Sequence, residues 1–218
     1  MLNASSLREQ VYLYLRNEIQ TGNLLPGASI NLDKLSRELG ISKTPLKEAI
    51  IKLECEGFVK ALPRKGIMVK KLVYQELKDY YEILGSLEAG VVLSVFEQFS
   101  VENIEEMKAS NAEQEKALDD EEFDRYYQLN LDFHDIFLKQ SDNLTLREYI
   151  MPLKQRLYDF PRQKYWKEWE QVNLDEHCRF IASIEKGDKQ GAASIIKDEH
   201  WGWKKHEPYF IKFYKFDE

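Results

Sequence analysis

The segment Leu39–Ile50, LGISKTPLKEAI, decides the fold of the N-terminal part of this chain. Gly40 supplies the backbone freedom that a helix-ending turn needs. Ser42 is a good N-cap for a new helix, and Pro45 is tolerated in a first helical turn because its missing N–H would be unpaired there. The segment therefore predicts a tight turn followed by a helix.

Apolar residues on both sides of this turn predict two packed helices. Upstream, Leu32–Leu39 carries leucines at helical spacing. Downstream, Leu46, Ile50 and Leu53 form one stripe of the second helix. Two helices joined by a tight turn have the layout of a helix-turn-helix, which places the start of its second helix in the major groove of DNA.

The second predicted helix begins with polar and basic residues. Lys43, Thr44 and Lys47 lie at or near its N-terminus. Lysine side chains attract DNA phosphates, and residues at this end of the helix can also reach base edges. We therefore expect these three side chains to contact the major groove or the phosphates beside it.

Two short strand-like runs, Gly57–Leu62 and Gly66–Val69, follow the second helix. The turn between them is basic, and we expect its residues Arg64, Lys65 and Gly66 to reach phosphates or the minor groove. A solvated basic turn in a small helical domain is the alternative. Because turn, cap, apolar stripe and hairpin occur together, the pattern favours a winged helix-turn-helix.

Charge divides the chain into a basic and an acidic part. Residues 1–72 contain 12 Lys and Arg against 7 Asp and Glu. The whole chain contains 31 and 38, which leaves 19 and 31 for residues 73–218. This asymmetry indicates that only the first part meets a polyanion. We expect the acidic part to serve assembly or ligand sensing.

Length and composition allow two modest domains, which we place at residues 1–72 and 73–218. The chain has 218 residues, of which 43% are hydrophobic, so each part can bury a core. No apolar run approaches the roughly 20 residues that span a bilayer, and the N-terminus lacks the order of a signal peptide, so we expect a cytoplasmic protein. Cys55 and Cys178 belong to no C-x-x-C pair, and we expect free thiols.

Residues 5–70 resemble the winged helix of the GntR family of bacterial transcription regulators. The resemblance rests on Gly22-x-x-Leu25-Pro26-Gly27, on the segment Leu39–Ile50, and on Leu53, Gly57 and Pro63-x-x-Gly66. That family usually has Arg where this chain has Lys43 and Lys47. Lys keeps the charge but loses the bidentate fork that reads guanine, so the resemblance implies phosphate attraction without the family's base preference.

The second part of the chain is predicted to be helical throughout. Short charged or Gly-containing joints separate the helical patterns, so we expect an all-α antiparallel bundle of about six helices. The expected helices are Glu76–Phe99, Val101–Leu118, Glu121–Gln140, Leu144–Phe160, Asn173–Lys186 and Lys189–Lys205. The fold class is therefore mainly α, with a winged helix-turn-helix followed by this bundle.

Residue types that bind metals recur in the predicted bundle. Asn130 and His134 are one helical turn apart, and His177 and the pair Glu199 and His200 lie on later helices. Imidazoles with a carboxylate or amide oxygen suit zinc, nickel, manganese or iron, with positions left for an outside ligand. Taken alone, each of these histidines also fits an ordinary bundle position.

Residues 73–205 resemble the FCD ligand-binding domain of the FadR subfamily within GntR. The matching pieces are Asn130-x-x-Phe133-His134, Ser141-x-Asn143-x-x-Leu146, Glu176-His177 and Ile184-x-x-Gly187-Asp188-x-x-x-Ala192. The resemblance implies a divalent metal held by an Asp, a His of the same helix and two later His, with a carboxylate effector completing the shell. Asn130 stands at the Asp position. Leu84 replaces an Arg that is common in these domains, which removes a partner for an acidic effector.

The last metal ligand is either Glu199 or His200. His200 lies 23 residues after His177, one more than the family pattern, and an ungapped count puts Glu199 at the ligand position. In a continuous helix Glu199 shares a face with Ile195 and Ile196, which favours an inward carboxylate. His200 is only about 100° away around the helix, so both remain candidates.

These observations predict a homodimeric, ligand-responsive transcription regulator. It would bind a palindromic operator through the winged helix and a small metabolite, an organic acid held through a divalent metal, in the bundle. We expect the first bundle helix, around Leu77–Val91, to form the dimer interface. A metal-ion sensor is one alternative. A zinc-dependent hydrolytic enzyme is another, but we see no general base beside the cluster, and such an enzyme would not need a basic wing.

Overall fold

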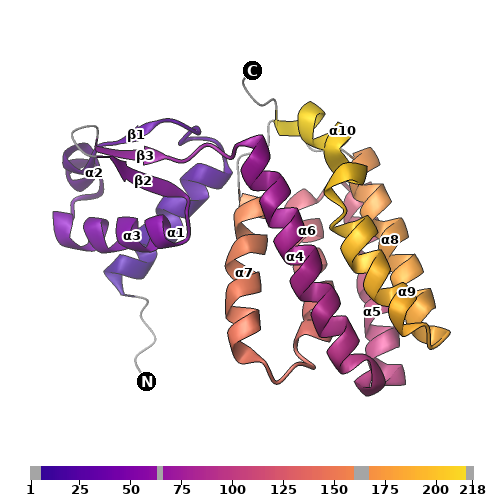
Figure 1. Cartoon of the computed structure of the whole chain (residues 1–218). Coiled ribbons are helices and arrows are strands. Elements are labelled where there is room, and N and C mark those ends of the chain that lie inside the picture. The colour runs from indigo at the N-terminus through magenta and orange to yellow at the C-terminus, as the bar shows by residue number, and fades with distance from the viewer. Residues whose placement is uncertain (1–5, 63–65, 160–166, 215–218) are drawn as a thin grey trace. The chain divides into compact units, whose positions relative to one another are not determined.

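The computed structural model describes residues 6–62, 66–159 and 167–214. The chain divides into two compact units. One unit comprises Met1–Val73 with Gln155–Arg162, and the other comprises Tyr74–Lys154 with Gln163–Glu218. Figure 1 shows the small sheet and three helices of the first unit and the helical bundle of the second.

The first unit is a three-helix domain with a small sheet. Its helices and strands follow in the order α1 Leu7–Gln20, β1 Ser29–Ile30, α2 Leu32–Leu39, α3 Lys43–Cys55, β2 Val59–Leu62 and β3 Gly66–Val69. The strands pair antiparallel in the order β1-β3-β2, and Leu62 of β2 faces Gly66 of β3. The predicted hairpin is therefore present. The sequence analysis missed β1, which has only two residues.

The turn between α2 and α3 has the conformation that the sequence predicts. Gly40 ends α2 in the left-handed region at φ 65°, and its N–H donates to the carbonyl of Ser36. Ser42 occupies the N-cap position of α3, but its side chain makes no capping hydrogen bond. The turn therefore depends on Gly40 and on packing rather than on a Ser42 cap.

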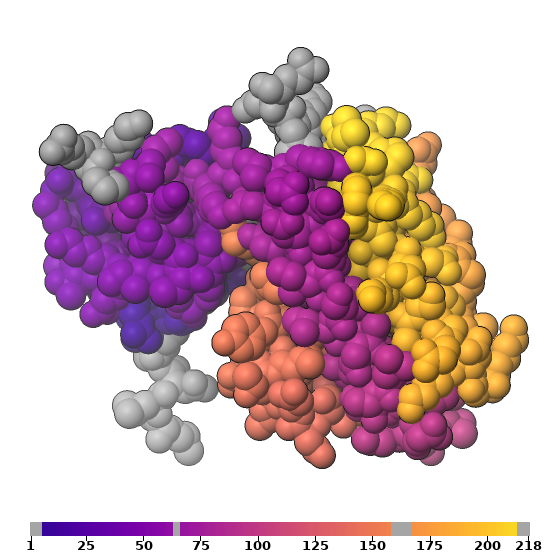
Figure 2. Space-filling model, viewed as in Figure 1, coloured from indigo at the N-terminus to yellow at the C-terminus, as the bar shows by residue number. Residues whose placement is uncertain are grey.

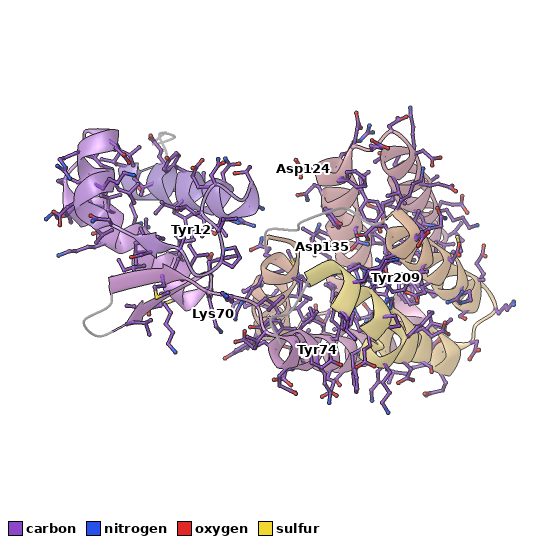
Figure 3. All side chains as sticks on the ribbon, turned by 90° about the horizontal axis from the view of Figure 1, so that it is seen from above. Tyr12, Lys70, Tyr74, Asp124, Asp135 and Tyr209 are labelled. Carbon is purple, nitrogen blue, oxygen red and sulfur yellow. The ribbon has the colours of Figure 1, made fainter. Side chains whose placement is uncertain are left out.

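Burial of one face of each helix holds the first unit together. Leu15 of α1 and Leu46 and Leu53 of α3 are fully buried. Tyr12, labelled in Figure 3, lies in the same core, and its hydroxyl donates to Glu56 Oε2 at 2.7 Å. This core orients α3 so that its opposite face is exposed to solvent.

The second unit is a bundle of α-helices. Its main helices are α4 Tyr74–Val95, α5 Val101–Asp119, α6 Phe123–Leu138, α7 Leu144–Asp159, α8 Lys167–Glu185, α9 Lys189–Ser194 and α10 Trp203–Tyr214. Only the part of α7 up to Lys154 belongs to this unit. A short 3-10 helix, Phe96–Gln98, follows α4. The core contains fully buried aromatic residues from several helices, including Tyr126, Phe133, Phe180 and Phe210.

The last predicted helix, Lys189–Lys205, differs from the structure. It begins as α9, continues as a π-helical segment over Ile195–His200, and breaks before α10 begins at Trp203. We call Ile195–His200 the π turn. It packs against α4 and α8, and the chain from α9 to α10 lies beside α4 on the face seen in Figures 1 and 2.

The predicted fold class, a winged helix-turn-helix followed by an all-helical bundle, is confirmed. Within the described part of the chain, no helix is both long and apolar enough to cross a lipid bilayer. Cys55 and Cys178 are both free thiols.

Candidate DNA-binding face and histidine cluster

The first turns of α3 present an exposed polar face. Lys43, Thr44 and Lys47 are all exposed, while Leu46 and Ile50 on the opposite side are buried. Because the N-terminus of a helix carries unpaired N–H groups and a partial positive charge, it favours phosphate nearby. The three residues predicted to contact DNA therefore lie on one accessible helix end.

The two lysines of this face differ in their surroundings. The Lys43 ammonium forms an ion pair with Asp33 in the first turn of α2. The hydrogen bond and charge of Lys43 lower the pKa of the Asp33 carboxyl. Lys47 forms no ion pair with any residue that the structure describes. Of these two lysines, Lys47 can therefore bind a phosphate without giving up an ion pair.

The hairpin tip is only partly covered by the structure. Gly66 opens β3 at φ 80°, a left-handed conformation that favours glycine. Arg64 and Lys65 lie outside the described residues.

Three buried histidines converge inside the second unit. His134 of α6, His177 of α8 and His200 of the π turn each offer a ring nitrogen, and these nitrogens lie within 4.8 Å of one another. Phe133 stacks on the His177 ring with a centroid distance of 3.9 Å. His134, His177 and His200 form what we call the histidine cluster.

The second ring nitrogens of two cluster residues have oxygen partners. His134 Nδ1 lies 2.7 Å from Glu88 Oε2, and His177 Nδ1 lies 3.0 Å from Asn111 Oδ1. Because these oxygens accept, Nδ1–H of each ring is the hydrogen-bond donor, and the lone pair of the neutral ring is then on Nε2. Both Nε2 atoms are buried and have no hydrogen-bond partner among the described residues.

Burial keeps these two imidazoles neutral. Burial, opposed by Glu88 and aided by the charges of Lys154 and His200, lowers the pKa of His134 to about 3. Burial also lowers the pKa of His177 well below its ordinary value. A neutral imidazole with a free Nε2 lone pair is the form that binds a metal ion, so the cluster fits the group that its residue types predict.

A buried ion pair supports His134 from the side away from its Nε2. Glu88 is fully buried and accepts hydrogen bonds from Lys154 Nζ at 2.9 Å and from Trp201 Nε1 at 2.8 Å. Burial raises the pKa of the Glu88 carboxyl, but His134 and Lys154 outweigh it and hold the pKa well below the ordinary range. Sequence reasoning missed Glu88, Lys154 and Asn111 as parts of this site.

Glu176 lies beside the third cluster residue. Its Oε1 accepts a hydrogen bond from Lys205 Nζ, and its Oε2 lies 3.2 Å from His200 Nδ1 without the alignment of a hydrogen bond. Burial raises the pKa of the Glu176 carboxyl, but the adjacent His200, followed by the charge of His206 and the hydrogen bond from Lys205, lowers it to about 2. A buried carboxylate thus adjoins His200.

Asn130 is buried one helical turn before His134, as its spacing predicts. Its side-chain N–H donates to Gln114 Oε1 at 3.4 Å.

Glu199 lies outside the cluster. Its side chain is 38% exposed and accepts hydrogen bonds from Arg179 Nη2 at 2.6 Å and from Lys205 Nζ at 3.4 Å. The expectation of an inward Glu199 is wrong because it assumed a continuous α-helix. In the π turn the N–H of Trp201 donates to the carbonyl of Ile196, five residues back, so the following residues rotate and His200 faces inward.

A cavity of about 510 Å³ opens on the other side of the π turn. It is lined by Glu82, Ser86, Lys197, Asp198, Trp201, Gly202, Trp203 and Lys204. None of the cluster histidines lines it, so it is distinct from the site at which the three rings converge.

A winged helix-turn-helix joined to an all-helical domain is an architecture of bacterial transcription regulators. Residues 7–69 match the bacterial regulatory proteins of the gntR family, and residues 79–199 match the FCD domain. The chain belongs to the GntR family of regulators with an FCD domain, and it is a DNA-binding transcriptional regulator.

Named relatives and solved structures agree with this family. The chain is 27% identical over 189 residues to the HTH-type transcriptional regulator YdhC of Bacillus subtilis. The matched region covers 86% of this chain and 84% of that protein. It is 27% identical over 175 residues to the Nta operon transcriptional regulator of Aminobacter aminovorans, covering 78% and 80%. The structure of E. coli McbR/YncC superimposes with a TM-score of 0.71 at 20% identity, covering 94% and 98%. The matched families and the named relatives are transcriptional regulators, not enzymes.

Proposed function

We propose that this regulator is a cytoplasmic homodimer that binds a palindromic operator and responds to a small organic acid held through a divalent metal ion. His134, His177 and His200 would bind the ion, with Asn130 as a further oxygen donor. The observation that carries this proposal is the convergence of three buried imidazoles, two of which have unpaired Nε2 atoms. Buried polar atoms without partners are rare, and a cation at this point would satisfy them.

The ligand set suits zinc, nickel, manganese or iron. Because the three imidazoles are neutral donors, a divalent ion bound there keeps its charge and attracts an anionic ligand to its open positions. A carboxylate from a small organic acid is such a ligand. Leu84 is fully buried where related domains carry an Arg, so the effector's acid group would depend on the metal rather than on this position.

A chelator titration separates this proposal from a metal-ion sensor. For an effector-responsive regulator, we expect operator affinity to depend on the organic acid while the metal stays bound. For a metal sensor, operator affinity would follow the free metal concentration with no organic ligand present. Elemental analysis of the purified protein establishes whether the ion is there, and metal-free protein with no affinity for zinc would contradict the proposed site.

On the DNA side, we propose that Lys43, Thr44 and Lys47 contact the major groove or its phosphates, and that Arg64, Lys65 and Gly66 form the wing contact. The exposure of the first three residues on one helix end supports this assignment.

Lys47→Ala should weaken operator binding by about 1–3 kcal/mol if Lys47 contacts a base, or lower the salt dependence by roughly one unit if it holds a phosphate. Lys43→Ala should have the smaller effect, because Lys43 must give up its ion pair with Asp33 to reach DNA. Gel-shift titrations at several salt concentrations measure both quantities. Lys167→Ala, at an exposed lysine of the other unit, is the matched control. Unchanged binding in both α3 variants would contradict the assignment.

Dimerisation should involve α4, because a palindromic operator needs two heads related by a dyad. Ile83 on α4 is a large apolar side chain that is 43% exposed. We expect the protein to sediment as a dimer at micromolar concentration and Ile83→Asp to shift it toward monomer. Ile211→Asp, at an isoleucine of α10 that is 60% exposed, should leave the dimer intact. A monomer that binds the palindrome with full affinity would rule out the dyad.

A further inference from the structure

The π turn provides the extra residue between the second and third cluster histidines. A π-helical turn contains one more residue than an α-helical turn and occurs often at functional sites. The separation of 23 residues between His177 and His200 is one more than the family pattern, and Ile195–His200 accommodates it. The insertion therefore decides which of two neighbouring ligand-type residues faces the cluster.

The same residues have a second possible register. If Ile195–His200 became α-helical, the residues after it would rotate by about 100°, and Glu199 would take the inward position of His200. Both residues are able to bind a divalent cation. The adjacent break before α10 contains Gly202, and the backbone freedom of glycine allows the break to absorb such a rotation. A Cβ at Gly202 would lie 2.1 Å from the Asp198 carbonyl oxygen, so the π register requires glycine.

When no ion is bound, the contacts on the inner side of the π turn disfavour the π register, and those on its outer side favour it. Inside, the π register leaves His134 Nε2, His177 Nε2 and His200 Nδ1 buried without hydrogen-bond partners among the described residues, which is unfavourable. Outside, the register is held by the pairing of Glu199 with Arg179. Both side chains of that pair are more than a third exposed, and such pairs are weak.

We propose that Ile195–His200 is a two-register element, and that a divalent cation on the histidine cluster selects its π register. This inference rests on the proposed metal site. A bound ion favours the register that supplies His200, since a ligand shifts a two-state equilibrium only through its different affinity for the two states. Without the ion this preference is lost. The α register would remove the unpaired imidazole of His200 from the interior at the cost of bringing the Glu199 carboxylate inward, so we expect the metal-free segment to populate both registers.

The register change would alter the surface of the bundle. Lys197, Asp198, Trp201 and Gly202 of this segment line the 510 Å³ cavity, whose opposite wall is Glu82 and Ser86 of α4. Trp201 also donates to Glu88 Oε2, the same oxygen that contacts His134. A rotation of the π turn therefore changes the wall next to α4, which is the helix that we propose for the dimer interface.

Hydrogen–deuterium exchange of the full-length protein, with and without zinc alone, tests the proposal. We expect zinc to slow amide exchange over residues 195–202 by at least tenfold, because the metal-free segment samples two registers. A variant in which Asp198 is deleted lacks the extra residue of the π turn, so His200 would face the cluster in an ordinary α-helix. It should bind zinc at least as tightly as wild type, with exchange in this segment that no longer depends on zinc.

Zinc affinity in point variants gives a second measurement that needs no deletion. Glu199→Gln and Arg179→Gln should each weaken zinc binding by about two- to fivefold, because each removes the exposed ion pair that holds the π register. The double variant should lose no more zinc affinity than either single variant, because both changes remove the same pair. Asp119→Asn removes the same charge from a second exposed pair, formed with Lys167 at 2.6 Å, and should leave zinc affinity unchanged.

The outcomes are distinguishable. Zinc bound by wild type, with equal exchange over 195–202 in both states and unchanged affinity in Glu199→Gln, would overturn the two-register proposal and leave the metal site standing. Wild-type protein that binds no zinc would overturn both.

Discussion

His177→Ala and His134→Ala should each abolish stoichiometric metal binding and lower the melting temperature of the metal-loaded protein. Each variant removes one of three neutral nitrogen donors from a buried site, and two donors hold a divalent ion poorly. A ligand that binds only the folded state stabilises it by about 2.7 kcal/mol at a hundred times its Kd, so this stabilisation should disappear with the ion. Elemental analysis and thermal melts with and without a chelator measure both effects.

His206 supplies the matched control, because it is the remaining histidine of the four in the chain. It is also fully buried, but both of its ring nitrogens are occupied: Nδ1 accepts from Trp169 Nε1 at 2.8 Å, and Nε2 donates to the Glu199 carbonyl at 2.9 Å. His206→Gln should lower stability while leaving one metal ion per chain. Equal metal content and equal chelator response in all three variants would show that the cluster histidines are ordinary core residues.

The helix-turn-helix could be predicted from the sequence because its signals are local. Gly40 in the left-handed region and the buried stripe of Leu46, Ile50 and Leu53 each follow from residue type and helical spacing. The basic hairpin was predicted for the same reason. β1 was missed because its two residues carry no periodicity and depend on pairing with β3.

The histidine cluster could be predicted only in part. His134 and His177 follow from the family-like spacing, and the structure brings them together with His200. The choice between Glu199 and His200 could not be made from α-helical phase, because phase arguments fail where a helix contains a π turn. Two signals were present in the sequence: the separation of 23 residues, and Gly202 two residues after the end of the segment.

The residues that support the cluster gave weaker signals. Glu88 and Lys154 are charged residues within amphipathic helices, where a charge usually indicates the solvent face. They lie 66 positions apart in the sequence and meet only because α4 and α7 come together in the bundle. Long-range pairing of this kind leaves no local pattern, so the buried pair could be found only in the folded chain.

Lys154→Met should destabilise the second unit by about 3–5 kcal/mol, because it leaves the buried Glu88 carboxylate without its cation. Met keeps the length and apolar stem of Lys, so the packing changes little. The Lys154→Met, Glu88→Gln double variant should recover part of this loss, because a neutral amide has no charge to compensate. Denaturant unfolding in the presence of a chelator measures the free energy without a contribution from bound metal.

The control for this experiment is the exposed ion pair between Lys167 and Asp119, whose side chains are 51% and 64% exposed. Lys167→Met should cost less than about 1 kcal/mol, since water screens such a pair and solvates the remaining carboxylate. Each pair joins one lysine to one carboxylate at a similar distance, and the main difference between them is burial. Glu88 also contacts Trp201 and His134, but neither of these carries the positive charge that Lys154→Met removes. If Lys154→Met cost no more free energy of unfolding than Lys167→Met, water would have to reach the Glu88 carboxylate. A hydrated Glu88 would no longer hold His134 in the tautomer that leaves Nε2 free for a metal ion.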